Sequence, residues 1–432
     1  MPPKRGLESV TLAISPDAVS TKKKIKSSAT QNAVLNFFRP ASQKLPEPTT
    51  WRVIDGSLLI GKFLRSDNQE EKRGDRRKIA GFDLDGTLIV TQSGNRHAKT
   101  ETDWKWWHEC VPGKLKQLHE EGYQIIIFTN QAGIKAPKKE TANLKKFKLK
   151  VASVLAALDI PLTLYAATEN DHFRKPRTGM WEEMKDDYDL DVHGVDLENS
   201  FLVGDAAGRE GDFSDSDRHW ALNVGIGFHT PEEFFLNQPG EAMFHRFDPA
   251  SHIIEDQSVT TLSVFKPSEG KEIVVFVGFP GAGKSTFFRR HLQPMEYERV
   301  NQDILKSRDK CVRVAREFLA QEKSVAIGNN NNTNADIASR AVWISLAKEH
   351  DVPVRCLHFT AHQELCQHND AVRAFGGELV NPEKRTVLPK MAFSGYASRF
   401  KAPEKSEGFE DVITVDFQGG VEERAVWTKY WI

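Results

Sequence analysis

The stretch from Lys78 to Val90, KIAGFDLDGTLIV, decides the fold that we expect for this chain. An apolar run with strand character ends at Phe82. On an extended chain, residues two apart face the same way, so Asp83 and Asp85 emerge together where the strand ends. Two like charges this close need a cation or a proton between them, and Gly86 allows a sharp turn. Two carboxylates with Mg²⁺ suit phosphoryl transfer. The alternative is an Asp-rich turn after any buried strand.

Three further apolar runs are followed by residues that suit the same chemistry. Thr129 and Asn130 end the run 123–128, and their hydroxyl and amide can hydrogen-bond a phosphate. Lys175 follows the next run and supplies a cation for phosphoryl oxygens. Asp205 follows the last run and suits Mg²⁺. Ligands of open α/β sheets bind at the carboxyl ends of the strands, so we expect one shared site.

Other features of the segment 104–217 can be interpreted in more than one way. The tryptophans within 104–107 stack on unpaired bases or, as is more common, pack in the core. The basic segment 138–158 predicts an amphipathic helix with a solvated charged face. The acidic loop 212–217, which includes Asp217, supports a metal ion or is only solvated.

A second motif lies in the other half of the chain. The stretch 278–286, GFPGAGKST, matches the phosphate loop GxxxxGK[ST] and lies between an apolar strand and a predicted helix. In such a loop the backbone N–H groups cradle phosphates, Lys284 contacts the β- and γ-phosphates, and Ser285 binds Mg²⁺. Asp303 follows the next strand and accepts a proton from an attacking hydroxyl or caps a helix. The expected ATP-binding residues are Gly278, Phe279, Pro280, Gly281, Ala282, Gly283, Lys284, Ser285 and Thr286.

Length and composition set the class of protein. A chain of 432 residues predicts two to three domains, and 28% charged residues with a net charge of −1 are typical of a globular protein. The four cysteines lack metal-ligand spacing, which indicates a reducing compartment without a disulfide or zinc scaffold. No apolar run approaches the roughly 18 residues of a membrane span, so we expect no membrane association. We also expect the protein to be a monomer.

Residues 1–48 have a different composition, rich in Pro, Ser, Thr and Lys, and we expect them to be disordered. Residues 1–50 carry eight Lys and Arg against three Asp and Glu. The basic clusters at Lys4–Arg5 and Lys22–Lys26 are compatible with nuclear import, so we expect a nuclear protein. The alternative is a solvated run of charge.

The same tail contains a short motif, QNAVLNFF at residues 31–38. Gln31, Val34, Phe37 and Phe38 resemble the peptide that docks on the sliding clamp PCNA. One helical turn would place the three apolar side chains on one side as a hydrophobic plug. The alternative is an amphipathic turn that packs on its own protein.

DLDGT is typical of the haloacid dehalogenase-type phosphatases, and residues 78–205 resemble that superfamily in the order Asp-x-Asp, Thr-Asn, Lys, Gly-Asp. The resemblance implies that Asp83 is a nucleophile that forms an aspartyl-phosphate. It implies that Asp85 is the general acid and then the base, and that Thr129 and Lys175 hold the phosphoryl group. It also implies that Asp205, with Asp83 and the backbone carbonyl of Asp85, holds Mg²⁺.

A wider resemblance, from residue 51 to the end, is to eukaryotic polynucleotide kinase 3′-phosphatases. It rests on KIAGFDLDGTLI, IIIFTNQAGI, FRKPRTGMW, FLVGDAAGR, VGFPGAGKSTF and SGYASRFKAPEKSEGF. The resemblance implies an α/β architecture, with a haloacid dehalogenase-like phosphatase domain (49–255) followed by a P-loop kinase domain (256–432), each with a mostly parallel sheet. It implies removal of 3′-phosphates and ATP-dependent phosphorylation of 5′-hydroxyls at DNA nicks, gaps and double-strand breaks. Asp303 would be the kinase base.

The chain departs from that family in three places. We expect the chain to lack the forkhead-associated domain of animal members, and we expect its tail to recruit partners instead. Gln302 replaces an Arg, and Asn331 replaces an Asp. Two alternatives therefore remain: an enzyme acting on small phosphorylated metabolites, and a clamp-tethered scaffold with a degenerate kinase half.

Overall fold

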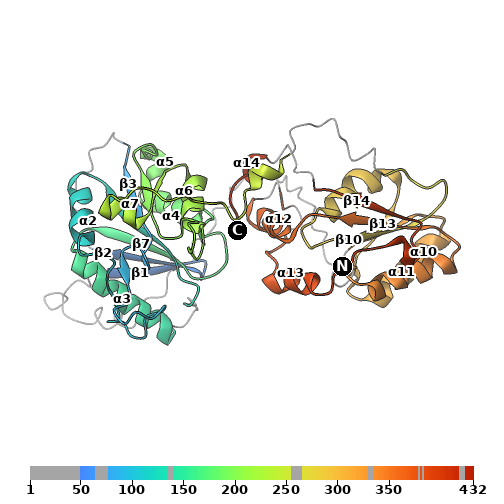
Figure 1. Cartoon of the computed structure of the whole chain (residues 1–432), viewed down its shortest axis with the longest axis horizontal. Coiled ribbons are helices and arrows are strands. Elements are labelled where there is room, and N and C mark those ends of the chain that lie inside the picture. Colours follow the sequence, from blue (N-terminus) through green and yellow to red (C-terminus); the bar gives the residue numbers. More distant parts are fainter. Residues whose placement is uncertain are drawn as a thin grey trace, which may run out of the picture.

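The structure, a computed structural model, shows two lobes, one on each side of a junction near the C terminus (Figure 1). It describes residues 49–63, 76–134, 140–253, 265–328, 334–377, 380–381, 384–417 and 424–432. The basic tail with the Gln31–Phe38 motif, the expected boundary at 255, and Asn331 lie outside the described residues. The side chain of Asp303 is likewise not described.

The first lobe is built on one sheet. In the described part of the chain it has seven strands, in the order β1-β2-β7-β6-β3-β8-β9. The strands are β1 Thr49–Ile54, β2 Leu58–Phe63, β3 Ile79–Phe82, β6 Gln124–Asn130, β7 Leu162–Ala167, β8 Phe201–Val203 and β9 Gly227–His229. From β7 to β9 the neighbours are parallel, and β1 and β2 add an antiparallel edge. The short strands β4 Ile89–Val90 and β5 Lys105–Trp106 pair separately.

Helices cover both faces of this sheet, which explains why its inner strands are apolar throughout. The helices are α2 Val111–Glu120, α3 Ala142–Leu158, α4 Gly179–Asp187, α5 Leu190–His193, α6 Ser216–Val224 and α7 Pro231–Leu236. On β3, Phe82 packs with the α2 and α3 side, whereas Ile79 packs with Trp181 and Trp220 on the opposite face. The expected helix 138–158 begins at Ala142 in the structure.

The second lobe has a parallel sheet throughout its described strands, in the order β11-β12-β10-β13-β14. The strands are β10 Ile273–Val277, β11 Glu298–Val300, β12 Val325–Ile327, β13 Val354–Phe359 and β14 Asp411–Val415. The helices are α8 Lys284–Phe287, α9 Gln302–Leu305, α10 Arg308–Ala320, α11 Ile337–Glu349, α12 Gln363–Phe375, α13 Lys390–Ala397 and α14 Arg424–Trp427. Shorter helical turns cover Pro249–His252, Phe288–Leu292, Gln293–Met295 and Lys405–Glu407.

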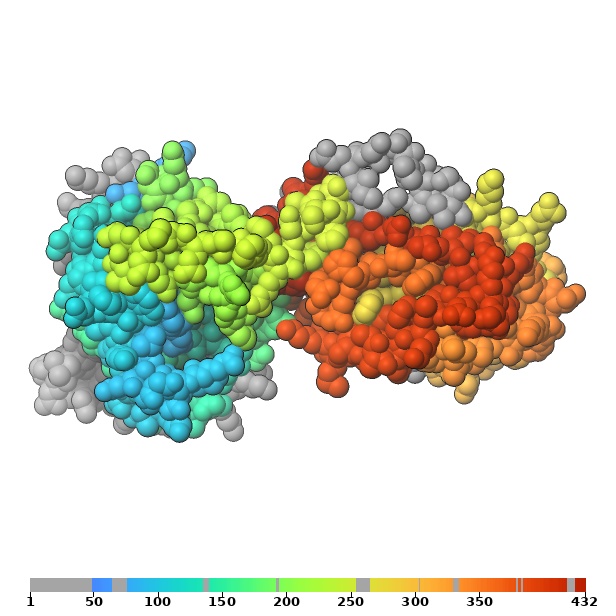
Figure 2. All heavy atoms as spheres, in the orientation of Figure 1, coloured from blue at the N-terminus to red at the C-terminus, as the bar shows by residue number. Residues whose placement is uncertain are grey.

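The last residues of the chain reach back to the first lobe, and on the face shown in Figure 2 the lobes meet at a narrow waist. The Asn223 side chain donates to the backbone oxygens of Tyr430 (2.6 Å) and Pro176 (2.9 Å), and it accepts from the Tyr430 backbone N–H (2.9 Å). The Tyr430 ring stacks on His219 with 3.8 Å between ring centroids. Arg177 donates to the Trp431 carbonyl at 3.2 Å. The end of the second lobe is therefore held beside Pro176, the neighbour of Lys175.

We expect Asn223→Ala to loosen this junction. The substitution leaves the Tyr430 N–H and two carbonyls without their partner, which costs about 1–3 kcal/mol for each buried group left unsatisfied. The measurement is the urea midpoint of the full chain, which should fall. Asn199→Ala is the matched control, because the Asn199 side chain bonds Asp196 in an exposed turn away from the junction. Equal midpoints for the two variants would contradict the assignment.

Candidate active sites

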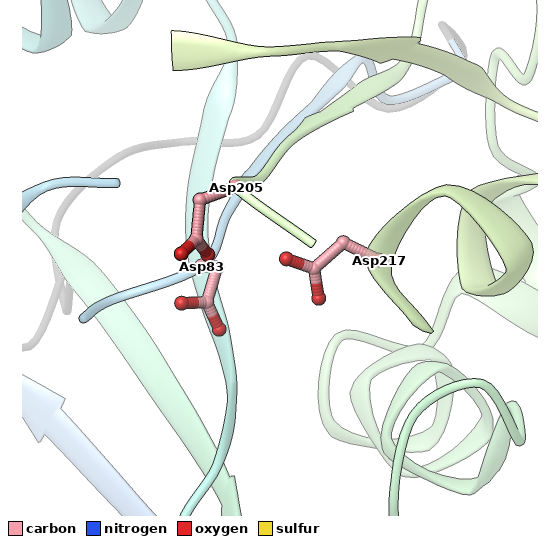
Figure 3. A group of neighbouring side chains, drawn as sticks. All are labelled: Asp83, Asp205 and Asp217. Carbon is pink, nitrogen blue, oxygen red and sulfur yellow. The ribbon is translucent and has the colours of Figure 1, made fainter. Parts of the chain in front are cut away.

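The carboxyl ends of β3 and β8 bring carboxylates together in the first lobe. Within the described residues, oxygen atoms of Asp83, Asp205 and Asp217 lie within 4.8 Å of one another (Figure 3). Asp83 follows β3, Asp205 follows β8, and Asp217 lies in the first turn of α6. The side chain of Asp217 takes the third position in this cluster, whereas the sequence left its role open.

A buried cation lies against this acidic cluster. The ammonium of Lys175 donates to Asp83 Oδ1 at 2.6 Å and to the Phe128 carbonyl at 2.7 Å, and it lies 2.7 Å from Asp217 Oδ1. Lys175 is only 3% exposed. A buried ammonium is costly unless it is paired and hydrogen-bonded, so these contacts fix its position. The sequence-predicted pair of Asp83 and Lys175 therefore meets in space.

Burial and like charge shape the electrostatics of the cluster. Burial raises the pKa of Asp83 well above its usual range, against the opposing effect of the Lys175 charge. Burial, and then the charge of Asp217, raise the pKa of Asp205 to about 7. Burial lowers the pKa of Lys175, but Asp217 and Asp83 outweigh it and raise the value above the usual range. The cluster thus has more negative charge than Lys175 alone balances, which favours a further cation.

Asp85 points away from the cluster toward a second pair of side chains. Its carboxylate accepts from Gln131 Nε2 at 2.7 Å and from Lys150 Nζ at 2.9 Å, and half of its side chain is exposed. Gln131 also donates to the hydroxyl of Thr129 at 3.0 Å. Two hydrogen bonds therefore hold Asp85 in the lining of the cleft, with half of its side chain open to solvent.

The expected polar residues at the end of β6 have different surroundings. Thr129 is buried and joins Asp85 through Gln131. Asn130 pairs with the backbone of Lys175 in both directions, at 3.0 and 3.1 Å, and so holds the loop that carries the lysine. Gly86 has a φ of +88°, and a Cβ there would overlap the carboxylate of Asp205. Only glycine allows this close approach.

Both lobes line the cleft that contains this site. The cleft has a volume of about 1180 Å³ and includes Asp83, Asp205 and Lys175. Lys390 and Asp370 line it from the second lobe. A cleft of this size exceeds the usual range for a small-molecule pocket, which is about 300–1,000 Å³, and suits a longer substrate.

The predicted phosphate loop lies between β10 and α8 in the second lobe. Lys284 is buried and donates to the carbonyls of Gly278 (2.7 Å) and Phe279 (2.5 Å), so its ammonium lies inside the loop. Gly281 has a φ of +82°, and a Cβ there would overlap the Cys366 carbonyl on α12. The Ser285 hydroxyl accepts from Arg299 at 2.6 Å. The loop is therefore shaped by its glycines before any ligand binds.

Two residues that shape the first site, Gln131 and Lys150, were not identified from sequence, and the role of a third, Asp217, was left open. Gln131 carried no recognised signal, and Asp217 was one of several acidic residues in a loop. Lys150 was assigned to a solvated face, and that interpretation is wrong for this residue, since it is buried against Asp85. The usable signal was helical spacing, because Lys150 lies on the same face of α3 as the buried Phe147, Val151 and Val154. The tryptophans of 104–107 pack against the core, as the alternative interpretation predicted.

Comparisons with known proteins find relatives of both lobes. A family model described as Polynucleotide kinase 3 phosphatase matches residues 78–235, and one described as AAA domain matches residues 273–403. The chain is 41% identical to a bifunctional polynucleotide phosphatase/kinase of Schizosaccharomyces pombe, over 88% of each chain. It is 34% identical to a putative bifunctional polynucleotide phosphatase/kinase of Acanthamoeba polyphaga mimivirus, over 85% of this chain and 93% of the relative. It is 31% identical to the polynucleotide 3′-phosphatase ZDP of Arabidopsis thaliana, over 43% of this chain and 27% of that protein.

The fold and the sites define a two-part enzyme, with a haloacid dehalogenase-like phosphatase lobe followed by a P-loop kinase lobe. The chain belongs to the family of bifunctional polynucleotide phosphatase/kinases. The resemblance and the fold class expected from the sequence are confirmed. In the part of the chain that the structure describes, no helix has the length and apolar character needed to cross a bilayer.

Proposed function

We propose that this enzyme repairs the ends of broken DNA strands. Its first lobe, within residues 49–255, removes 3′-phosphates through an aspartyl-phosphate, and its second, within 256–432, phosphorylates 5′-hydroxyls with ATP. The observation that carries the first half is the buried lysine between two carboxylates, Lys175 with Asp83 and Asp217. Relatives named for both activities support the pairing of the two lobes.

Asp83 is the nucleophile in this proposal. Its carboxylate is buried, and Lys175 holds one oxygen at 2.6 Å, which orients the other toward a phosphorus atom entering from the cleft. The Lys175 charge also offsets the negative charge that builds up on the phosphoryl oxygens. Thr129 lines the same cleft and offers a hydroxyl without adding charge.

Asp85 protonates the leaving 3′-oxygen and then accepts a proton from the water that hydrolyses the aspartyl-phosphate. Gln131 and Lys150 hold its two oxygens, and its half-exposed side chain has access to solvent. The proton given to the alcohol in the first step is recovered from water in the second.

The acidic cluster fits Mg²⁺, because it offers carboxylate oxygens close together and carries charge that Lys175 alone does not balance. Asp83, Asp205 and Asp217 would hold the ion, with the Asp85 backbone carbonyl as the further donor implied by the family resemblance. When bound, Mg²⁺ neutralises charge between the nucleophile and the phosphoryl oxygens.

In the kinase lobe, Lys284 contacts the phosphates of ATP and Ser285 is the ligand for its Mg²⁺, both from the loop 278–286. The Lys284 ammonium donates to two carbonyls of the loop. In the ATP complex, phosphate oxygens would replace these carbonyls as its acceptors. Asp303, which follows β11 in the sequence, accepts the proton of the attacking 5′-hydroxyl.

For the tail we propose nuclear import through its basic clusters and docking on PCNA through Gln31, Val34, Phe37 and Phe38. The support is the sequence pattern, with paired aromatics in a polar segment. Replacing both Phe37 and Phe38 by Ala should abolish clamp binding in a pull-down, and equal binding would remove the idea.

One experiment tests the main proposal. The enzyme is incubated with a nicked duplex that carries a 3′-phosphate and a 5′-hydroxyl, with Mg²⁺ and with or without ATP, and both ends are read on a sequencing gel. We expect loss of the 3′-phosphate in both samples and a new 5′-phosphate only with ATP. Unchanged ends alongside turnover of free sugar phosphates would refute the proposal.

We expect Lys150→Met to lower kcat for 3′-phosphate removal by about tenfold. This loss is smaller than the whole rate enhancement that a general acid–base supplies, because Asp85 itself is kept. The rate falls because Asp85 loses one of the two groups that position it. Lys150→Arg should restore most of the rate. Lys145→Met, on the exposed face of the same helix, is the matched control and should match the wild type. A rate for Lys150→Met equal to this control would show that Asp85 needs no such support.

A further inference from the structure

Phe213 is an exposed aromatic side chain at the phosphatase site. Its side chain is 80% exposed and lines the same cleft as Asp83 and Asp205. A single exposed apolar residue is common and needs no explanation by itself. Its position in the cleft, and the two observations that follow, separate Phe213 from the other exposed apolar residues.

The first observation is that hydrogen bonds tie down the backbone of the loop that carries Phe213. The carboxylate of Asp212 accepts from the backbone N–H groups of Ala207 (3.1 Å) and Arg209 (3.0 Å). The backbone carbonyl of Asp212 accepts from Arg246 at 2.5 Å, and Gly208 N–H donates to the Ser214 carbonyl on the other side of Phe213. The backbone on both sides of Phe213 is therefore hydrogen-bonded to neighbouring segments, while the ring itself projects into solvent.

The second observation is a cation on this ring. The guanidinium of Arg96 lies 5.0 Å from the Phe213 ring centroid, and Arg96 lines the same cleft. The segment of Arg96 is also held, because the Asp103 carboxylate accepts from the N–H groups of Ser93 (2.8 Å) and Lys99 (3.2 Å). Two elements distant in sequence thus bring a planar cation and an open aromatic face together.

This pair has the chemistry of a base-stacking surface. Aromatic rings and guanidinium planes stack on nucleobases of any sequence, because every base has a π-face. A ring on a hydrogen-bonded backbone loses less conformational freedom on binding than a ring on a free loop, which favours its use in recognition. A small phosphorylated metabolite without a planar ring would gain nothing from it.

We propose that Phe213 and Arg96 form a shelf on which the 3′-terminal nucleobase stacks while its phosphate occupies the Asp83 site. This inference rests on the proposed 3′-phosphatase function and deepens it, since it assigns the contact that distinguishes a polynucleotide end from a simple phosphate ester. Recognition by stacking predicts broad tolerance of the terminal base.

The test compares Phe213→Ala with the wild type on two single-stranded substrates. One has an ordinary 3′-terminal nucleotide with a 3′-phosphate, and the other has an abasic 3′-terminal sugar with a 3′-phosphate. On the first, we expect kcat/KM to fall roughly tenfold, in keeping with the loss of one stacked base. On the second, the difference between the two enzymes should vanish, and Phe213→Trp should restore activity on the first.

Leu222→Ala is the matched control, because Leu222 is half exposed on α6 and does not line the cleft. It should leave kcat/KM unchanged on both substrates. Equal values for Phe213→Ala and the wild type on the first substrate would overturn the shelf. An equal loss on both substrates would also overturn it, since the base would then play no part. Failure of the wild type to release any phosphate would instead refute the proposed 3′-phosphatase function.

Discussion

Asp83→Asn should reduce 3′-phosphate removal by at least about 10³-fold and leave 5′-phosphorylation intact. The amide has the shape of the carboxylate but cannot attack phosphorus as an anion. Lys175 keeps its contacts with Asp217 and the Phe128 carbonyl, so the packing of the site should survive. The measurement is release of phosphate from a 3′-phosphorylated oligonucleotide, with kinase activity of the same preparation as the folding control.

The matched control for this variant is Asp191→Asn. Asp191 is an exposed carboxylate of the same lobe, paired only loosely with Lys185 at 3.5 Å. It should retain full activity at both ends of the substrate. If Asp83→Asn kept a rate comparable to Asp191→Asn, the nucleophile would have to be a different group.

Lys284→Ala should reduce kinase activity by about 10²–10³-fold. A loss of this size is the usual result of removing one hydrogen-bond donor to a charge that builds up in the transition state. The buried ammonium inside the phosphate loop is the group lost, and alanine leaves the glycines that shape the loop unchanged. The measurement is transfer of labelled phosphate from ATP to a 5′-hydroxyl oligonucleotide.

Phosphate removal from the 3′ end should remain at the wild-type rate in Lys284→Ala. Lys323→Ala serves as the control within the same lobe, because the Lys323 ammonium pairs with Glu298 and lies over the Phe318 ring, and neither residue belongs to the phosphate loop. Loss of both activities in Lys284→Ala, with Lys323→Ala unaffected, would show that the two sites do not work separately. Full kinase activity in Lys284→Ala would remove the phosphate loop from the mechanism.

The positions of the chemical residues along the chain could be predicted because each follows a local pattern. An apolar run ending in DLDGT predicts a buried strand followed by paired carboxylates, and GFPGAGKST predicts a strand, a loop and a helix. The structure shows the strand at β3 and the strand, loop and helix at β10 with α8. The predicted pairing of the two carboxylates is wrong, because the Asp85 side chain bonds Gln131 and Lys150 and lies outside the acidic cluster that contains Asp83. These motifs are short, so the order of strand, loop and helix in each follows from adjacent residues.

The partners of those residues could not be predicted in the same way. Lys150 meets Asp85 across 65 positions of sequence, and Lys175 donates to the Phe128 carbonyl across 47. Whether a helical lysine faces solvent or a carboxylate depends on which side of the helix packs on the sheet. A basic amphipathic pattern is compatible with either.

The sequence by itself determined the two α/β lobes, the nucleophile candidate Asp83 and the phosphate loop, because strand periodicity and turn chemistry are written in adjacent residues. Only the tertiary structure decided that Asp217 joins the acidic cluster, that Lys150 and Gln131 hold Asp85, and that Asn223 holds the end of the chain. It also decided that both lobes line one cleft. The physical reason is that such contacts depend on how sheets and helices pack, and packing joins side chains that no local pattern relates.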